Sequence, residues 1–256
     1  MNKDIWQRKE VHPLGSVQMN IWGDTKTGKT SLALDFPAPL FVVNADRSMD
    51  HLLAKLGDKE YYYVDFVPHD IVGEIDEVVS KVLFNRFKEI VMDAVSGGKG
   101  TIILDGGVRV WDIVTEAFVP NKGDVPPKAY QKANKEFEDM LDKVVNSGVN
   151  LVITNQSREI WVSAGQKSGA LKSGGFSRLN YWVSAVVQTK KERVRNVNGS
   201  VAISHVVEFG DNGYDTRLEG LKLKNPTFEK LYTLYHKEYN PKLYDKLWME
   251  MGSLDE

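Results

Sequence analysis

Residues 23–30 of the sequence read GDTKTGKT, which places two glycines, two lysines and three threonines within eight positions. The stretch fits the pattern G-x-x-x-x-G-K-[ST], in which glycines let successive backbone N–H groups turn toward one anion. In this pattern the lysine contacts the β and γ phosphates of a nucleotide, and the following hydroxyl binds the bridging Mg²⁺. We therefore expect ATP and Mg²⁺ as cofactors, held by Gly23, Asp24, Thr25, Lys26, Thr27, Gly28, Lys29, Thr30 and Ser31. A simple glycine turn is the alternative, but it does not explain a Lys-Thr pair at a helix start.

A second motif, TIILD at residues 101–105, is an apolar run that ends in a carboxylate. A triphosphate site needs such a carboxylate beside the magnesium ion, at the end of a neighbouring strand. The sequence therefore predicts Thr30 and Asp105 as metal ligands. The alternative for Asp105 is a turn residue at a strand end, and Asp112 is a weaker candidate for the metal.

The elements that must position these residues alternate between strand and helix. Short apolar runs predict strands at residues 17–22, 40–44, 61–67, 101–105 and 150–154, and helical spacing predicts helices at 29–35, 48–56, 70–95 and 130–147. Such alternation indicates an α/β fold with a mostly parallel sheet flanked by helices, whose binding site forms at the carboxyl ends of the strands.

The rest of the chain is predicted to extend this core. Two strands after residue 181, joined by a turn at 196–200, indicate a C-terminal antiparallel extension. Glycine clusters at 96–100 and 168–175 and the segment 120–130 read as loops. We expect a single domain over residues 1–256, with a helical tail at 227–256 that docks on the core or, as the less favoured alternative, on a partner.

The composition of the 256 residues excludes several kinds of site. The chain has no cysteine, which removes disulfides and thiolate chemistry. Its five histidines lack zinc-binding spacing, so we expect them to be ordinary. Charges within residues 1–19, and no run of about 18 apolar residues elsewhere, predict a cytoplasmic protein without a membrane partner.

Three stretches resemble the core of the RecA-type recombinases: LFVVNADRSMDHLLAKLG, LVITNQSRE and GGFSRLNYWVSAVVQTKK. The resemblance spans about residues 17–195 in motif order. The sequence looks most like the phage-encoded RecA-core ATP-binding proteins of the Sak type, which are linked to single-strand annealing and recombination. This implies a RecA-like P-loop NTPase fold and, for a phage protein, the cytoplasm of the host cell.

The resemblance also implies roles for two polar residues. Asp46 takes the position of the acidic residue that polarises the attacking water, although the family usually has glutamate there. Aspartate is one methylene shorter, so we expect slow or DNA-stimulated ATP hydrolysis. Gln156 matches the residue that senses the γ-phosphate. The alternatives are a helix N-cap for Asp46 and an amide that satisfies strand-end backbone groups for Gln156.

Positive charge is concentrated in residues 156–195, which hold eight basic and two acidic side chains and so carry a net charge of +6. Because the whole chain has a net charge of −2, the remainder carries −8. Such segregation suits a nucleic-acid backbone, and the Gly/Ser-rich residues 165–175 are expected to form a mobile loop. The predicted contacts with single-stranded DNA are Arg158, Trp161, Lys167, Lys172, Phe176 and Arg178. The alternative is a solvated loop with Trp161 in the core, where Tyr181 and Trp182 are also expected.

Three further basic residues, Lys190, Lys191 and Arg193, match the place where RecA-type proteins reach the γ-phosphate of a neighbouring subunit. They are predicted to act in trans within a ring or short filament. The alternative is a basic strand end in solvent.

Together these features predict an ATPase that binds single-stranded DNA in phage recombination or replication, as an annealing protein or recombination mediator. A single-strand-binding or replication protein is expected as a further partner. One alternative is a nucleotide-dependent assembly or helicase-loader module with little hydrolysis and a protein partner. A small-molecule phosphotransferase is less favoured, because the sequence shows no arginine-rich lid.

Overall fold

One mixed sheet organises the protein, and its strands follow the apolar runs of the sequence. The computed structural model describes residues 15–46, 49–67, 75–119, 126–163, 166–195 and 201–252. Its strands are β1 (Gln18–Gly23), β2 (Leu40–Asn44), β3 (Tyr61–Asp65), β4 (Thr101–Asp105), β5 (Asn150–Ser163), β6 (Gln166–Ser173), β7 (Ala185–Arg195), β8 (Val201–Asn212) and β9 (Lys222–Lys224). They lie in the order β3-β2-β4-β5-β1-β7-β8-β9, and β6 pairs with β5 outside this path.

The sheet is parallel from β3 to β7 and antiparallel from β7 to β9. This confirms the predicted α/β fold and its antiparallel C-terminal extension. β5 separates β1 from β4, the two strands that carry the sequence motifs. In register, Asp105 lies between Asn44 and Thr154, and Gly23 lies beside Gln156. The carboxyl ends of β1, β2 and β4 therefore meet at one edge of the sheet, beside residues 154–156 of β5.

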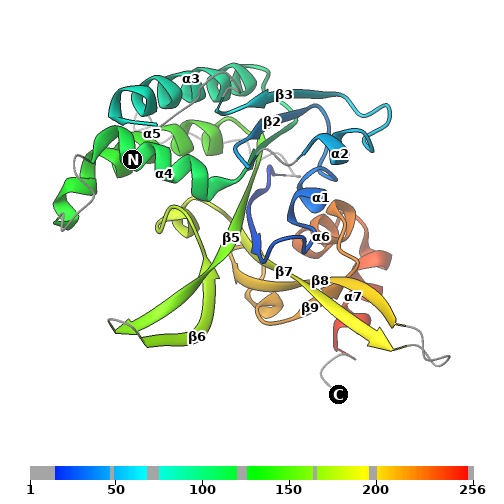
Figure 1. Ribbon diagram of the computed structural model, residues 1–256. Coiled ribbons are helices and arrows are strands. Elements are labelled where there is room, and N and C mark those ends of the chain that lie inside the picture. The colour runs from blue at the N-terminus through cyan, green and yellow to red at the C-terminus, as the bar shows by residue number, and fades with distance from the viewer. Residues whose placement is uncertain are drawn as a thin grey trace, which may run out of the picture.

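Helices cover both faces of the sheet (Figure 1). They are α1 (Lys29–Ala33), α2 (Asp50–Leu53), α3 (Glu77–Ser96), α4 (Gly107–Phe118), α5 (Gln131–Asn146), α6 (Phe228–Tyr235) and α7 (Pro241–Gly252). Three of them, α3, α4 and α5, pack on one face, and α1, α6 and α7 pack on the other. Helix α4 is absent from the sequence-based prediction. No helix among the described residues has the length and apolar character to span a membrane.

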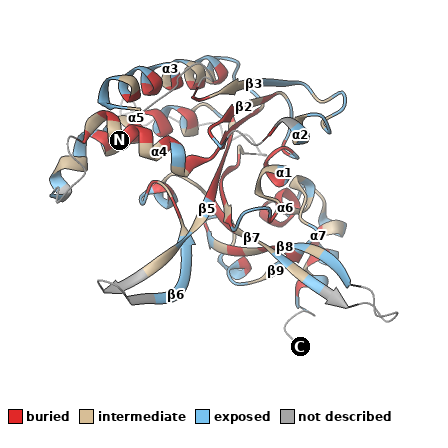
Figure 2. Cartoon of the chain, in the orientation of Figure 1, coloured by how far each residue is buried: buried red, intermediate tan, exposed pale blue. Residues whose placement is uncertain are grey.

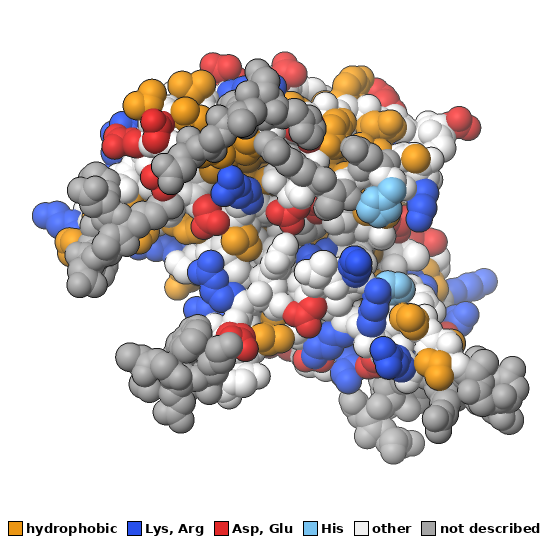
Figure 3. All heavy atoms as spheres, in the orientation of Figure 1, with side chains coloured by type: hydrophobic (Ala, Val, Ile, Leu, Met, Phe, Trp, Pro, Cys, Tyr) orange, Lys and Arg blue, Asp and Glu red, His pale blue; other side chains and the backbone are white. Residues whose placement is uncertain are grey.

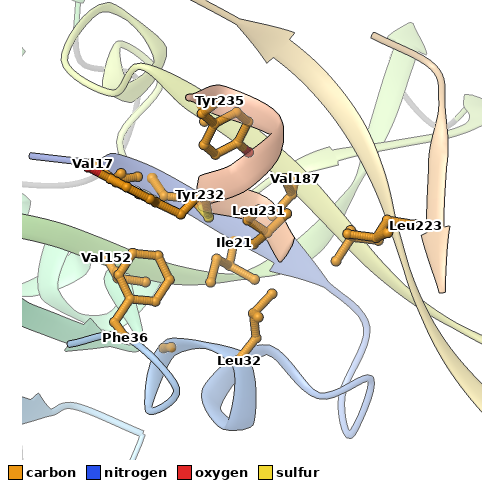
Figure 4. Packing of buried hydrophobic residues seen from close by; sticks show 14 of the residues in the cluster. Val17, Ile21, Leu32, Phe36, Val152, Val187, Leu223, Leu231, Tyr232 and Tyr235 are labelled. Atoms are coloured by element: carbon orange, nitrogen blue, oxygen red, sulfur yellow. The ribbon is translucent and has the colours of Figure 1, made fainter. Parts of the chain in front are cut away.

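The tail after residue 226 folds against the face that carries α1. Thr227 caps α6 by accepting a hydrogen bond from the Lys230 N–H at 3.3 Å. Figure 4 shows Leu231 and Tyr232 of α6 beside Ile21 of β1. All three side chains are buried, as the red core between the layers in Figure 2 illustrates. This packing holds β1, the strand after which the glycine-rich loop begins, against α6.

The segment predicted as a mobile Gly/Ser-rich loop, residues 165–175, proves to be largely a strand. β5 continues nine residues past its predicted end at 154, and β6 pairs with it antiparallel to form a ribbon that projects from the sheet (Figure 1). The prediction was wrong because residues 166–173, QKSGALKS, lack the apolar alternation that marks a strand in sequence.

Candidate nucleotide-binding site

The loop at residues 23–30 joins β1 to α1, and two of its glycines are required by close neighbours. Gly23 has φ 151°, and a Cβ there would lie 2.4 Å from the carbonyl oxygen of Thr189 on β7. Gly28 has φ 101°, and a Cβ there would lie 3.0 Å from Nδ1 of His205 on β8. The loop is therefore shaped by the two strands beside it, since neither position accommodates a side chain without displacing a neighbour.

Hydrogen bonds hold the same loop from within. The Thr27 hydroxyl lies 2.8 Å from the Asp24 carbonyl oxygen and 2.6 Å from the Thr189 hydroxyl. His205 Nδ1 lies 3.0 Å from the Thr27 carbonyl oxygen, so this ring nitrogen donates the bond. Strands β7 and β8 thus hold the loop in place through Thr189 and His205.

Lys29 is the first residue of α1, and its ammonium group lies over the loop. Nζ donates to the carbonyl oxygens of Gly23 at 2.9 Å and Asp24 at 2.7 Å. Burial lowers the pKa of Lys29, while the charges of Asp105, Asp46 and Asp24 act in the opposite direction. The structure therefore places a cation between the loop and two carboxylates from β4 and the end of β2, as a phosphate site requires.

Asp105 ends β4 and is 2% exposed. Its Oδ1 accepts hydrogen bonds from the Thr30 hydroxyl at 2.9 Å and from the Thr154 hydroxyl at 2.7 Å. Burial raises the pKa of Asp105, and these two hydrogen bonds oppose the shift. The two predicted metal ligands, Thr30 and Asp105, are thus in direct contact. Asp112, the weaker candidate, lies on α4 and does not line the pocket formed here.

Asp46 lies just past β2 and faces the start of α4. A Cβ on Gly106, which has φ 99°, would lie 2.5 Å from Asp46 Oδ1, so this glycine makes room for the carboxylate. Helix α2 begins at Asp50, four residues after Asp46, so Asp46 is not its N-cap. The side chain is exposed and belongs to the pocket, where it is open to solvent.

These residues surround one pocket of about 540 Å³ at the carboxyl edge of the sheet. Its lining residues come from six segments of the chain: Thr25, Lys26, Gly28, Lys29, Thr30, Ser31, Asp46, His51, Leu52, Asp105, Thr154, Gln156 and His205. Gln156 is exposed here, whereas its neighbour Asn155 is buried and donates to Asn20 Oδ1 at 3.0 Å. The local motif residues and the carboxylates thus converge as the sequence predicted.

Four pocket residues were missed by the sequence analysis: His51, Leu52, Thr154 and His205. Thr154 faces Asp105 only because β5 pairs with β4 in this register. His205 reaches the loop only because β8 folds back beside β7. Neither contact has a local signal in the sequence, since 49 and 178 positions separate the bonded residues.

The predicted DNA contacts are divided between the ribbon of β5 and β6 and the segment that follows it. Arg158 on β5 and Lys172 on β6 are cross-strand partners and both are exposed. Trp161 and Lys167 pair in the same ribbon, where their backbone alone is described. Arg178 lies beyond the ribbon and donates to Glu138 Oε1 at 3.0 Å. The ribbon therefore carries four of the six predicted residues.

The assignment of Phe176 to base stacking was wrong. Its side chain is 4% exposed, and its ring centroid lies 4.6 Å from that of Trp111 and 5.2 Å from that of Phe137. A ring enclosed by two others offers no face to a nucleobase. Conversely, Tyr181, which was expected in the core, is 87% exposed, while Trp182 packs at the edge of the core.

The three residues predicted to act in trans lie on β7 and differ in exposure and in ion pairing. Lys190 forms an ion pair with Glu208 of β8 at 2.7 Å, so its charge is engaged within its own chain. Lys191 and Arg193 are exposed and lie opposite His205 and Ile203. Figure 3 shows Lys and Arg side chains gathered over this part of β7 and β8.

The fold and site define the class of the protein. A glycine-rich loop after β1, a carboxylate at the end of β4 and a further strand between them make an α/β P-loop ATPase domain with a RecA-like core. The sequence matches the AAA domain family over residues 16–209, and the protein belongs to this family.

Other comparisons add less. No curated protein matches the sequence. Among solved structures, the KaiC-like protein PH0186 from the hyperthermophilic archaeon Pyrococcus horikoshii OT3 is similar, with a TM-score of 0.45 and 12% identity. The similarity covers 82% of this chain and 85% of that one.

Proposed function

We propose that the protein is an ATP-binding, slowly hydrolysing RecA-like protein that binds single-stranded DNA in phage recombination or replication. In this proposal it acts in the host cytoplasm, as an annealing protein or recombination mediator. The observation that carries the nucleotide assignment is the convergence of Lys29, Thr30 and Asp105 on one pocket. The glycine-rich loop supplies backbone N–H groups for the phosphates, and Lys29 supplies the charge.

The residues of this pocket also fit Mg²⁺. A threonine hydroxyl and an aspartate carboxylate are hard oxygen ligands of the kind that Mg²⁺ takes beside a triphosphate. Thr30 and Asp105 lie 2.9 Å apart, and both line the pocket. A bound Mg²⁺ would neutralise charge on the phosphates, while Lys29 and the loop orient them.

The role of Asp46 is to activate water, and its geometry supports slow turnover. The carboxylate is exposed at the pocket and has a short side chain that must act from the end of β2. A general base has to come within hydrogen-bond distance of the water it activates. We therefore expect slow hydrolysis, with stimulation when DNA binds the adjacent ribbon.

Support for the DNA-binding role comes from the ribbon of β5 and β6. Its base belongs to the pocket, because Gln156 lines the pocket and its backbone carbonyl oxygen accepts a hydrogen bond from the Gly174 N–H at 2.9 Å. Further out, Arg158 and Lys172 present two adjacent cations to solvent. A nucleotide sensed by Gln156 would thereby influence a cationic surface suited to a phosphate backbone.

The assembly proposed for the active protein is a ring or short filament. Lys191 and Arg193 are exposed on β7, which lies next to the loop strand β1, and either could reach the γ-phosphate of a neighbouring copy. Lys190 is the weaker of the three candidates because of its ion pair with Glu208.

Lys29→Ala tests the nucleotide assignment. The substitution removes the only cation that the loop holds over its carbonyl groups, so binding of labelled ATP should be abolished. Unchanged affinity would refute the assignment. The DNA-binding role is tested separately by titrating a fluorescent single-stranded oligonucleotide with the ATP-bound protein. Affinity should fall steeply as salt rises, and a flat salt dependence would contradict phosphate contacts.

A second candidate function is a nucleotide-dependent assembly or helicase-loader module. It is favoured by the burial of Phe176 and the ion pair of Arg178, which remove two of six predicted DNA contacts. ATP turnover measured with and without single-stranded DNA separates the two functions. Stimulation by DNA supports the first function, and its absence together with capture of a replication protein supports the second.

A further inference from the structure

Thr154 is a buried polar residue whose hydroxyl has two definite hydrogen-bond partners. It is 2% exposed and lies on β5, directly opposite Asp105 of β4. Its Oγ1 lies 2.7 Å from Asp105 Oδ1 and 3.1 Å from the Gly106 nitrogen. The backbone N–H must donate and the carboxylate must accept, so the single hydroxyl proton points to Asp105.

This hydrogen bond holds the Asp105 carboxylate from β5, a strand that carries neither of the two sequence motifs. Thr30 donates to the same oxygen, Oδ1, at 2.9 Å. Thr30 is itself a candidate metal ligand on helix α1, whereas Thr154 is held within the sheet by β4 on one side and β1 on the other. Both bonds go to Oδ1, so within the described part of the chain these two hydroxyls leave Oδ2 of Asp105 for another ligand.

We propose that Thr154 is a positioning residue for the metal: its hydroxyl holds Asp105 in the orientation that binds Mg²⁺ together with a nucleotide. The inference rests on the proposed nucleotide-binding function and names a residue outside both sequence motifs. It also explains why a hydroxyl residue stands in β5 among the apolar residues Leu151, Val152 and Ile153, which fill the core on either side of the sheet.

A purely structural role for Thr154 has a different consequence. In that case its hydroxyl would serve only to satisfy the Gly106 N–H, and its loss would lower stability without changing how Mg²⁺ acts. The effect of Mg²⁺ on nucleotide affinity therefore separates positioning from structure. This quantity is the ratio of the ATP dissociation constants measured in EDTA and in excess Mg²⁺.

The test uses Thr154→Val, which keeps the shape and removes the hydroxyl, and Thr154→Ser, which keeps the hydroxyl. Thr101→Val is the matched control, because Thr101 is a buried threonine at the other end of β4 that donates to the Pro37 carbonyl oxygen at 2.8 Å. Binding of fluorescently labelled ATP is measured for each variant in Mg²⁺ and in EDTA, and thermal unfolding without ligand reports the fold. Thr154→Ala serves as a second variant without the hydroxyl if Thr154→Val does not fold.

We expect the Mg²⁺ enhancement to fall about tenfold or more in Thr154→Val, as loss of a hydrogen bond to a charged group predicts. Affinity in EDTA should change less than about twofold, and Thr154→Ser and Thr101→Val should keep the wild-type enhancement. An unchanged enhancement in both variants without the hydroxyl, or an equal loss in Thr154→Ser, would overturn the inference alone. If wild-type protein bound no labelled ATP in either condition, the proposed function would fail and the inference with it.

Discussion

Gly23→Ala offers a direct test of the way that β7 shapes the phosphate-binding loop. The added methyl would lie 2.4 Å from the carbonyl oxygen and 2.6 Å from the hydroxyl oxygen of Thr189. Both contacts are too short to persist, so β1 and β7 must separate at the point where the loop begins. The residue would also keep a φ of 151°, which side chains rarely adopt.

A matched substitution at Gly148 separates the cost of backbone strain from the cost of the steric clash. Gly148 has φ 80°, but no atom lies within 4 Å of an added Cβ. Gly148→Ala should therefore cost about 1–2 kcal/mol of unfolding free energy from backbone strain alone. Gly23→Ala should cost about 1–3 kcal/mol more, since overpacking adds to strain. At about 2–4 °C per kcal/mol for a chain of this size, its melting temperature should be lower than that of Gly148→Ala by about 2–12 °C.

The two variants should also differ in their affinity for ATP. The carbonyl oxygens of Gly23 and Asp24 hold the Lys29 ammonium group, so displacement of the loop should weaken binding of labelled ATP in Gly23→Ala. Gly148 precedes β5 at the opposite edge of the sheet, so Gly148→Ala should bind ATP like the wild type. Equal melting temperatures for the two variants, or wild-type ATP affinity in Gly23→Ala, would refute the reasoning.

Three further predictions follow from the site and its surroundings. Asp105→Asn should abolish the enhancement of ATP affinity by Mg²⁺ yet stabilise the ligand-free protein at neutral pH, because burial raises the pKa of Asp105 in the folded state. Below about pH 4, where the carboxyl is protonated in the folded and the unfolded protein, this gain in unfolding free energy should vanish. In urea titrations the gain should grow as the pH rises toward the raised pKa of Asp105 in the folded protein and stay constant above it. Phe176→Ala should lower the unfolding free energy by about 3–5 kcal/mol and leave the DNA affinity of the folded fraction unchanged, whereas a selective loss of affinity would restore the stacking role. Arg158→Ala and Lys172→Ala should each reduce the slope of log affinity against log salt by about 0.7, and an unaltered slope would place DNA elsewhere.

The parts of the fold that the sequence predicted are those set by local patterns. β2 and β4 have the predicted bounds, because each is an apolar run closed by turn residues. The glycine-rich loop and Asp105 were found in the same way, since residue type and spacing carry their chemistry. Helix α4 was missed because it begins at Gly107, directly after a second glycine, and the pair resembles a loop.

The contacts that escaped prediction depend on pairs distant in sequence. Phe176 stands in a Gly/Ser-rich stretch and looked exposed, yet Trp111 of α4 and Phe137 of α5 enclose it. Thr154 and His205 join the pocket through strand register and through the return of β8, neither of which periodicity specifies. The sequence thus predicted the pocket residues that local motifs mark and missed those that reach the pocket through strand pairing.

Strand β5 is a single unbroken element that belongs both to the pocket and to the ribbon. Residues up to Gln156 pair with β1, and the seven that follow extend for about 23 Å beyond the sheet at about 3.3 Å per residue. A rotation of about 5° of this strand at Gln156 would therefore move its far end by about 2 Å. Because side chains alternate along a strand, inserting one residue after Thr154 would turn Ser157 and Arg158 to the opposite face of β5.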